Sequence, residues 1–522
     1  MKHRPIMFVG TGSDVGKSIL TTAFCRILKQ DGFSPAPFKA QNMSLNSYPT
    51  ADGREIGRAQ AVQAEASGIP CSSDMNPVLL KPSGDTTAQV ILHGRPIGNR
   101  SAKEYFNGQD RAWLFDEAMS AFDRLASSYD PIVIEGAGSI SELNLRDRDI
   151  VNMSVALRTE ASVFLIADID RGGVFGSIYG TLELLPPEER RLIRGIFINR
   201  FRGDMDLFAD GRRILERITG LPVLGVIPYL REIGIDQEDS LTIEKTAQDR
   251  TGALRIAVLL LPHMSNFTDF NVLERHPDIH LYYAAKPDDL DAADILILPG
   301  SKNTIADLLY LRRSGMASAL LGRHAEGASV YGICGGYQMM GLSVHDPLHV
   351  EGDISSIPGL ALLPVTTELT TEKRTEQVQF RFREGDALCK GYEIHMGVSV
   401  TERPSALCRI GYPGQEGRDD GYFISSRLWG TYIHGIFDNE PVIDWLLKEH
   451  SAKRSAPADD PAAYREKQYD RLADHVRKNT DMELFYGNVD FVGKPPELGV
   501  GPRGGDFRTG SSSGNVDGST ID

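Results

Sequence analysis

The segment IMFVGTGSDVGKS, which runs from Ile6 to Ser18, decides the fold of the first half of this chain. A short apolar run ends in a glycine-rich loop, and an apolar-periodic stretch, Ile19–Leu28, follows the loop. Strand, loop and helix in this order form a phosphate-binding loop, in which backbone N–H groups and the helix N-terminus face phosphate oxygens. The segment therefore predicts a site for a nucleoside triphosphate.

This loop supplies most of the expected contacts with the nucleotide. Lys17 reaches the terminal phosphates, and the hydroxyl of Ser18 can ligate Mg²⁺. The loop departs from the usual spacing, because Thr11 rather than glycine stands five residues before Gly16. We expect ATP to contact Gly12, Asp14, Gly16, Lys17 and Ser18.

Two carboxylates are candidates for holding Mg²⁺ together with Ser18. Glu135 follows the apolar run Pro131–Ile134, and carboxylate oxygens are hard ligands that suit Mg²⁺. Glu55, in the segment GREIGR of residues 53–58, is the second candidate. A glutamate that opens a helix also interacts favourably with the helix dipole, so a structural role for Glu55 has equal weight.

Short apolar runs alternate with helix-like stretches through the first half of the chain. This alternation predicts an α/β fold, a parallel sheet covered by helices, whose ligand sites gather at the carboxyl ends of the strands. The expected strands are Ile6–Val9, Pro131–Ile134, Ser162–Ile166, Gly195–Ile198 and Val223–Val226.

The same pattern starts again after a charged and less periodic stretch. Apolar runs at Leu254–Leu261, Asp294–Leu298 and Ser329–Ile333 predict a second α/β domain. Helical periodicity follows, and Gly, Ser, Asp and Thr dominate the last residues. We expect a P-loop domain over residues 1–235, a second α/β domain over 251–445, a helical extension over 446–487 and a flexible tail over 488–522.

Cys334 is the foremost candidate for a nucleophile. It stands in YGICGGYQ, residues 331–338, where an apolar strand ends and a helix begins. Small neighbours permit the sharp turn, the helix N-terminus stabilises a thiolate, and the N–H of Gly335 can help to bind an oxyanion. Because a cysteine between glycines packs poorly in a core, we favour a catalytic thiol.

A thiolate catalyst needs a proton partner, and two histidines have a suitable setting. His434, in GTYIHGIF of residues 430–437, follows an apolar run and precedes a glycine. His395, in GYEIHMG of residues 391–397, stands in a similar segment. His434 is the better placed, but the spacing alone does not separate the two.

Composition disfavours several classes of partner. Asp and Glu outnumber Lys and Arg by 71 to 56, and the formal charge of −15 argues against nucleic acid or an anionic membrane. The sequence has no apolar run near the ~20 residues of a membrane helix and no secretory signal pattern at its start. Its 5 scattered cysteines favour a reducing compartment, the cytoplasm. We expect small-molecule substrates and leave open whether the chain forms a homo-oligomer.

Several longer strings make the chain resemble the cobyric acid synthase family of amidotransferases. They are KAQNMSLNS at residues 39–47, EIGRAQ at 55–60, DMNPVLLKP at 74–82 and ADIDRGG at 167–173. The resemblance implies a dethiobiotin synthetase-like P-loop domain joined to a class I-like glutamine amidotransferase α/β domain. It also implies an ATP-dependent, glutamine-hydrolysing amide ligase.

The resemblance further implies a reaction. Enzymes of this family amidate four carboxylates, b, d, e and g, of (adenosyl)cobyrinic acid a,c-diamide in sequence and so give (adenosyl)cobyric acid. They use ATP, Mg²⁺ and glutamine, with no tightly bound prosthetic group. Arg54, Arg58, Lys81 and Arg171 supply positive charge that such a polycarboxylate needs.

Several residues fall on functional positions of that family. Cys334 and His434 match its nucleophile and base, but Ile436 stands where class I glutaminases carry the glutamate that orients the histidine. Glu393 is a candidate for that third role. By the same resemblance, Gln338 and Gly335 contact glutamine, Lys39 contacts phosphate and Asn199 contacts adenine.

Two alternative functions are compatible with the same motifs. One is a cobyrinic acid a,c-diamide synthase-like enzyme, which amidates only two carboxylates of the corrinoid. The other is a nucleotide-switched regulatory protein with a degenerate glutaminase domain. The strings at residues 39–47 and 74–82 favour the four-amide enzyme, and intact Cys334 and His434 disfavour the regulator.

Overall fold

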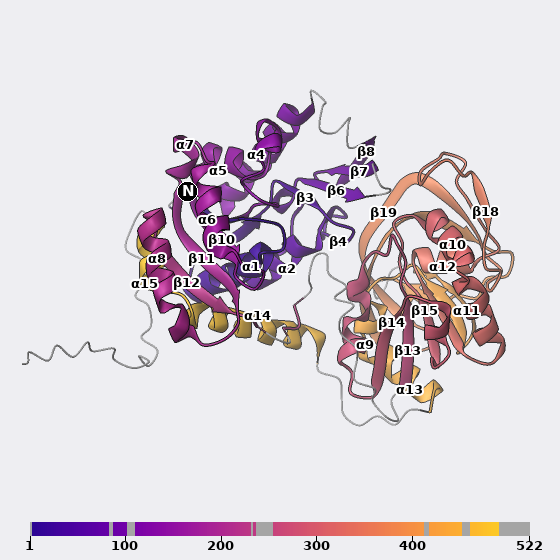
Figure 1. Ribbon diagram of the computed structural model, residues 1–522. Helices are drawn as coiled ribbons and strands as arrows, with labels where there is room; N and C mark the ends of the chain where they lie inside the picture. Colours follow the sequence, from indigo (N-terminus) through magenta and orange to yellow (C-terminus); the bar gives the residue numbers. More distant parts are fainter. Residues whose placement is uncertain are drawn as a thin grey trace, which may run out of the picture.

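The computed structural model describes residues 3–82, 87–101, 110–230, 233–235, 254–411, 417–451 and 460–489. Two α/β bodies lie side by side (Figure 1). We call residues 3–230 together with 460–489 the N-terminal unit, and residues 254–451 the C-terminal unit. The stretch expected between residues 235 and 251, and the expected tail from residue 490 on, lie outside the described residues.

The N-terminal unit is built on a six-stranded, all-parallel sheet of order β12-β11-β10-β1-β9-β2. Each expected strand of this half is present, and within this sheet the sequence pattern missed the three-residue β2. It also missed the strands of two smaller sheets in this half. The bounds are β1 Ile6–Gly10, β2 Ala36–Phe38, β9 Ile132–Glu135, β10 Ser162–Asp168, β11 Ile193–Phe201 and β12 Val223–Pro228.

Both faces of this sheet are buried, which explains why its strands read as continuous apolar runs. Along β1, Ile6 and Phe8 enter one core cluster with the first helix, whereas Met7 and Val9 enter another on the opposite face. The covering helices are α1 Lys17–Gln30, α2 Arg58–Ser67, α4 Asp110–Ser128, α5 Met153–Thr159, α6 Val174–Glu183, α7 Pro187–Arg190 and α8 Ala209–Thr219.

Two small sheets project from the N-terminal unit toward the C-terminal unit (Figure 1). One has four strands in the order β3-β6-β7-β8, and the other is the antiparallel pair of β4 and β5. The strings at residues 39–47, 55–60 and 74–82 run through them. Their bounds are β3 Gln41–Met43, β4 Ser47–Pro49, β5 Glu55–Gly57, β6 Val78–Pro82, β7 Thr87–Leu92 and β8 Arg95–Ser101.

The C-terminal unit has its own six-stranded sheet of order β14-β13-β15-β16-β24-β23. All neighbouring pairs are parallel except β23 with β24. The bounds are β13 Leu254–Leu259, β14 Ile279–Ala284, β15 Ile295–Leu298, β16 Ser329–Ile333, β23 Tyr422–Ser425 and β24 Leu428–Thr431. The helices are α9 Asn271–Arg275, α10 Thr304–Arg313, α11 Met316–Ala325, α12 Gly335–Met340 and α13 Glu440–Glu449.

A second, mostly antiparallel sheet of this unit contains a long hairpin made of β19 Thr366–Phe382 and β20 Leu388–Val400. The hairpin reaches β4 of the N-terminal unit: the side-chain amide of Gln377 donates to the carbonyl of Pro49 at 2.9 Å. The other strands are β17 Ser343–His345, β18 Ser356–Pro358, β21 Cys408–Ile410 and β22 Arg418–Asp420.

The chain ends by returning to the N-terminal unit, where α14 Pro461–Lys478 and α15 Met482–Asn488 pack against α1 and the first sheet (Figure 1). The ring of Phe485 lies 4.5 Å from that of Phe24 and 5.0 Å from that of Phe164, centroid to centroid. Within the described residues, no helix has the length and apolar character needed to cross a bilayer.

Candidate active sites

The glycine-rich loop joins β1 to α1 and has the backbone that its sequence requires. Gly16 has φ 97°, a left-handed conformation that favours glycine. A Cβ at this position would also lie 2.0 Å from Nδ2 of Asn199. The ammonium of Lys17 donates to the carbonyls of Gly12 at 2.9 Å and Gly138 at 2.8 Å, which holds it over the loop.

The structure brings together three residues that sequence reasoning assigned to the phosphate and metal site. The Oε1 atom of Glu135 accepts from the hydroxyl of Ser18 at 2.8 Å and from the ammonium of Lys39 at 2.9 Å. Gln63 donates to Oε2 at 2.5 Å. Burial raises the pKa of this carboxyl, but Lys39, Gln63 and Ser18 outweigh that effect and hold it below the ordinary value.

This arrangement fits a magnesium ion that is shared with a nucleotide. Ser18 and Glu135 offer two hard oxygen ligands within hydrogen-bond distance of each other. No group of three or more His, Cys, Asp or Glu side chains forms a metal site in the part of the chain that the structure describes. Mg²⁺ usually takes only one or two protein ligands beside phosphates and water, so two oxygens suffice.

Two further predicted nucleotide contacts flank the loop. Asn199, in β11, donates from Nδ2 to the carbonyl of Val15 at 2.9 Å. Asp14 is exposed and has φ 56°, and its carboxylate lies 3.8 Å from the guanidinium of Arg171. Asp14 thus lies within the loop that the sequence assigned to ATP, and Asn199 contacts that loop.

The structure corrects the assignment of Glu55 as a metal ligand. Its Oε1 accepts from Lys81 at 2.8 Å and from the hydroxyl of Ser47 at 2.7 Å. Its Oε2 pairs with Lys373, which comes from β19 of the C-terminal unit. A metal ion would have to displace two buried ammonium groups from this fully buried carboxylate. Lys81 is correspondingly engaged and not free for a polycarboxylate substrate.

Cys334 occupies a strained turn between β16 and α12. Its backbone has φ 52° and ψ −108°, which is rare for a residue other than glycine. The turn needs its glycines: a Cβ on Gly336 would lie 2.0 Å from the carbonyl oxygen of Leu298, and one on Gly335 would lie 2.8 Å from the amide nitrogen of Ser301. This sharp strand-to-helix turn is the geometry of a nucleophile elbow.

His434 lies beside Cys334 and is fully buried. Its Nδ1 is 2.7 Å from Oδ2 of Asp269, and Oδ1 of Asp269 accepts the N–H of Gly435 at 2.9 Å. Burial opposes the imidazolium, but Asp269 and Cys334 outweigh it and raise the pKa of His434 to about 10. The three side chains thus have the arrangement of a Cys-His-Asp triad.

Sequence reasoning missed Asp269 and offered Glu393 in its place, and the structure corrects this. Glu393 binds the guanidinium of Arg418, with one contact of 3.1 Å to its Oε1. Asp269 lies in a 3-10 turn, Phe267–Phe270, that follows β13. Its position after the first strand of the second sheet was the available signal, because ligand groups gather at the carboxyl ends of parallel strands.

The structure also separates the two candidate histidines. His395 stacks on Tyr432 with ring centroids 3.9 Å apart, and its Nδ1 lies 2.8 Å from the carbonyl of Gly397. Burial lowers the pKa of His395 to about 3, so it stays neutral. The carbonyl of the neighbouring Ile394 lies 3.6 Å from Sγ of Cys334. The acid–base geometry therefore belongs to His434.

Gln338 lies in α12, one turn after the nucleophile. Its Oε1 accepts from the hydroxyl of Thr304 at 2.9 Å, and its Nε2 lies 3.4 Å from the hydroxyl of Tyr432. Gln338 is buried, so it can contact glutamine only if the substrate enters beside α12. Gly335 precedes it in the same helix.

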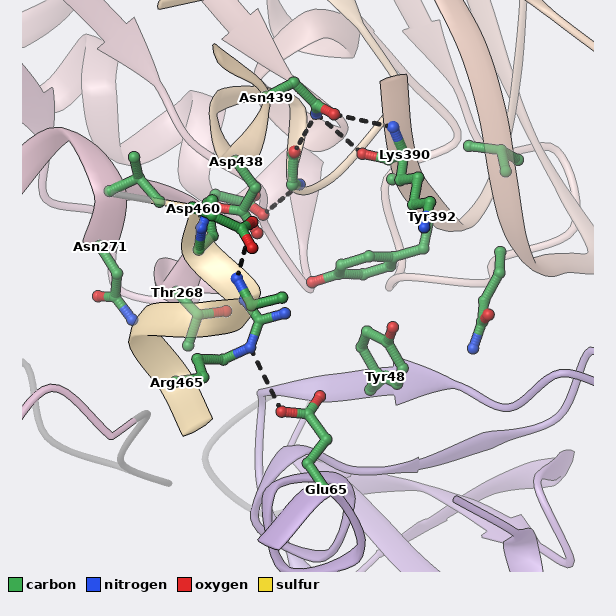
Figure 2. A pocket seen from close by; sticks show the side chains of 18 of the residues that line it. Tyr48, Glu65, Thr268, Asn271, Lys390, Tyr392, Asp438, Asn439, Asp460 and Arg465 are labelled. Atoms are coloured by element: carbon green, nitrogen blue, oxygen red, sulfur yellow. Dashed lines mark hydrogen bonds and ion pairs between the residues drawn. The ribbon is translucent and has the colours of Figure 1, made fainter. Parts of the chain in front are cut away.

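The two units meet around a cavity of about 550 Å³ that reaches Asp269 and Gly435. Figure 2 shows Tyr48 and Glu65 of the N-terminal unit below Tyr392 of the C-terminal unit. The rings of Tyr48 and Tyr392 lie 5.2 Å apart, and Tyr392 stacks on His434 at 5.2 Å. The triad therefore lies next to the interface with the N-terminal unit.

Comparison with known proteins matches two family domains to the chain. Residues 6–243 match the CobQ/CobB/MinD/ParA nucleotide-binding domain, and residues 255–442 match the CobB/CobQ-like glutamine amidotransferase domain. Fold and site together define a glutamine amidotransferase joined to a P-loop nucleotide-binding domain.

Full-length relatives place the chain more narrowly. A cobyric acid synthase of Bacteroides fragilis is 57% identical over 92% of this chain and 97% of its own length. Those of Syntrophobacter fumaroxidans and Citrobacter koseri are 48% and 44% identical, each over 92% of this chain and over 98% and 97% of their own lengths. The chain belongs to the cobyric acid synthase family.

Proposed function

We propose that this chain converts cobyrinic acid a,c-diamide, or its adenosylated form, to cobyric acid by amidating four carboxylates in sequence. ATP activates each carboxylate and glutamine supplies each nitrogen. The observation that carries the proposal is that one chain contains both the Ser18–Glu135–Lys39 cluster beside a P-loop and the Cys334–His434–Asp269 triad. Full-length likeness to cobyric acid synthases supports this choice of substrate.

Glutamine hydrolysis would begin at Cys334. Its sulfur attacks the side-chain amide carbon of glutamine while Nε2 of His434 takes the thiol proton. The N–H of Gly335 helps to stabilise the resulting oxyanion. His434 then returns the proton to the leaving nitrogen, ammonia departs, and a thioester remains on Cys334. Water activated by His434 cleaves the thioester and releases glutamate.

Amide formation would take place at the P-loop. A carboxylate oxygen of the corrinoid attacks the γ-phosphorus of ATP, ADP leaves, and an acyl phosphate forms. Lys17 and Lys39 stabilise negative charge on the transferring phosphoryl group, and Ser18 with Glu135 would hold Mg²⁺, which supplies further positive charge there. Ammonia then attacks the acyl carbon, and phosphate leaves. Gly12, Asp14, Gly16 and Asn199 are proposed to line the nucleotide site.

The proposal also includes residues that contact glutamine and the corrinoid, and a cellular compartment. Gln338 and Gly335 would position glutamine beside Cys334. A reducing cytoplasm is compatible with the cysteines, which are all unpaired: Cys25, Cys71, Cys334, Cys389 and Cys408. Arg58 and Arg171 remain proposed contacts for the carboxylates of the corrinoid.

The number of amides distinguishes this function from its two-amide sibling. Purified protein is incubated with the a,c-diamide, ATP, Mg²⁺ and excess glutamine, and glutamate release and product mass are measured together. Four glutamates released and four amides formed per corrinoid would support the proposal. Formation of only two new amides on the a,c-diamide, or no consumption of the a,c-diamide, would refute it.

A further inference from the structure

Asn266 lies between the two units and uses both ends of its side-chain amide. Its Oδ1 accepts the backbone N–H of Ser47, in β4 of the N-terminal unit, at 3.2 Å. Its Nδ2 lies 3.3 Å from Nε2 of His434. Asn266, Ser47 and His434 are all buried. One amide therefore joins the N-terminal unit directly to the catalytic base.

The chemistry of these groups fixes both the orientation of the amide and the proton on the histidine. The backbone N–H of Ser47 can only donate, so the oxygen of Asn266 must face it. The NH₂ group of Asn266 then faces Nε2 and donates to it, which requires an unprotonated Nε2. The proton of a neutral His434 accordingly sits on Nδ1, where Asp269 accepts it. The docked contact therefore opposes protonation of Nε2, against the effect of Asp269 and Cys334.

Glutamine hydrolysis must pass through the protonated state, because Nε2 accepts the proton of Cys334. A protonated Nε2 would face the NH₂ group of Asn266, and two donors that face each other repel. Turning the amide over would remove that conflict only by presenting NH₂ to the N–H of Ser47. Protonation of His434 and the Ser47–Asn266 bond are thus mutually unfavourable, and by linkage each weakens the other.

Ser47 is held by a buried cluster of charges that also crosses the interface. Its hydroxyl donates to Glu55 at 2.7 Å and accepts from Lys81 at 2.8 Å, and Glu55 in turn pairs with Lys373 of β19. A small displacement of this cluster would therefore move Ser47 relative to Asn266.

The same strand pair is connected to the phosphate site. Ser47 pairs with Gly57 across β4 and β5, and the N–H of Gly57 donates to Asn76 at 3.0 Å. Asn76 donates to the carbonyl of Lys39 at 3.2 Å, and the ammonium of Lys39 binds Glu135 beside the P-loop. Contacts thus run without a break from Glu135 to His434.

We propose that Asn266 is a positioning residue that couples the N-terminal unit to glutamine hydrolysis. With Ser47 docked, Asn266 opposes protonation of Nε2 of His434 and keeps glutamine hydrolysis slow. Occupation of the P-loop site by ATP and the corrinoid moves Ser47, frees the amide, and lets Nε2 accept the proton of Cys334. This inference rests on the proposed function, because it assumes a glutaminase that serves the P-loop site.

Two substitutions at Asn266 suit its left-handed backbone, φ 52° and ψ 42°. Asn266→Gly removes the amide, and Asn266→Asp offers one oxygen to Ser47 and another to a protonated Nε2. Gln377→Ala is the matched control, because it removes a hydrogen bond between the units, to Pro49 of the same strand, that does not involve His434. Glutamate release is measured with and without ATP, Mg²⁺ and the corrinoid diamide, alongside amidation from ammonium chloride.

Wild-type protein should release glutamate slowly alone and faster with the full substrate set. Both Asn266 variants should release it faster alone, by roughly 5–150-fold, the range of ordinary coupling between sites. Amidation from ammonium should persist, and Gln377→Ala should behave as wild type. Alkylation of Cys334 by iodoacetamide at neutral pH should also accelerate in the Asn266 variants.

Several outcomes would overturn the inference. One is a wild-type rate of glutamate release that does not change when ATP and the corrinoid are added. Another is a basal rate in the Asn266 variants that equals that of the wild type. A third is loss of glutamine hydrolysis in these variants, as expected for Cys334→Ala. If wild-type protein hydrolyses no glutamine under any condition, the proposed function fails instead.

Discussion

Oδ2 of Asp269 lies 2.7 Å from Nδ1 of His434, although 165 residues separate the two in sequence. Both side chains are buried, and the second carboxylate oxygen is fixed by the N–H of Gly435. Despite burial, which favours the neutral ring, Asp269 and Cys334 raise the pKa of His434 to about 10. In the proposed mechanism, Asp269 therefore orients the base and stabilises the imidazolium that forms during glutamine hydrolysis.

Replacing Asp269 by Asn should lower glutamine hydrolysis by roughly 10²–10⁴-fold, because the catalytic base loses its orientation and its electrostatic support. Without the carboxylate, burial should lower the pKa of His434, so the alkaline limb of the pH–rate profile should move from near pH 10 to lower pH. Glutamate release between pH 6 and 11 measures both effects. Asp438→Asn, which alters another carboxylate of the same cavity, is the control and should leave the profile in place.

Cys334→Ala should abolish amidation that depends on glutamine and leave amidation from concentrated ammonium salt intact. The reason is that Cys334 lies in the C-terminal unit, whereas the phosphate site lies in the N-terminal unit. Product formation with each nitrogen source is the measurement. Loss of both activities in a folded variant would show that the two chemistries are not divided in this way.

Lys17→Ala should eliminate amidation with either nitrogen source, by roughly 10²–10³-fold or more, because an ammonium that stabilises the phosphoryl group is lost. Glutamine hydrolysis should survive. Lys29→Ala, at the other end of α1 and about 18 Å along the helix, is the matched control. Near-normal amidation by the Lys17 variant would contradict the role given to the P-loop.

Glu55→Gln should destabilise the protein by about 3–5 kcal/mol, since it leaves the ammonium groups of Lys81 and Lys373 buried without their carboxylate. The measurement is the thermal midpoint at pH 5 and pH 9. Burial already lowers the pKa of Lys373 to about 7, even with Glu55 beside it.

The pH dependence of this loss follows from the charge on Lys373. In the variant its pKa should fall further. At pH 9 Lys373 is therefore neutral in both proteins, and the loss should be smaller than at pH 5, where the wild-type side chain is charged and paired with Glu55. Glu183→Gln breaks only a surface pair with Arg190 and should change the midpoint little. An equal loss at both pH values would exclude the unpaired charge of Lys373 as its cause.

Two turns and the strands of both parallel sheets could be predicted from local sequence patterns. The turns at residues 10–18 and 331–338 could be predicted because their own residues determine the backbone. Glycine is required at Gly16 by a positive φ, and at Gly335 and Gly336 by close approach of neighbouring atoms. The strands of both parallel sheets were predictable because burial on two faces leaves continuous apolar runs.

Partners that meet only in the folded chain could not be predicted in the same way. Asp269 lies 165 residues from His434 and carries no motif. Glu55 resembled a metal ligand because nothing near it in sequence reveals Lys373, which arrives from a hairpin of the other unit. The packing of α15 on Phe24 likewise depends on residues more than four hundred positions apart.

The central claim is that ammonia released at Cys334 is used at the P-loop of the same chain. Amide-¹⁵N-glutamine is supplied with ATP, Mg²⁺ and the a,c-diamide in the presence of unlabelled ammonium below the concentration that supports amidation alone, and the product is analysed by mass spectrometry. Wild-type protein should give cobyric acid with ¹⁵N in all four new amides, and Cys334→Ala should give no labelled product. Unlabelled or partly labelled amides from wild-type protein, or labelled product from the variant, would contradict it.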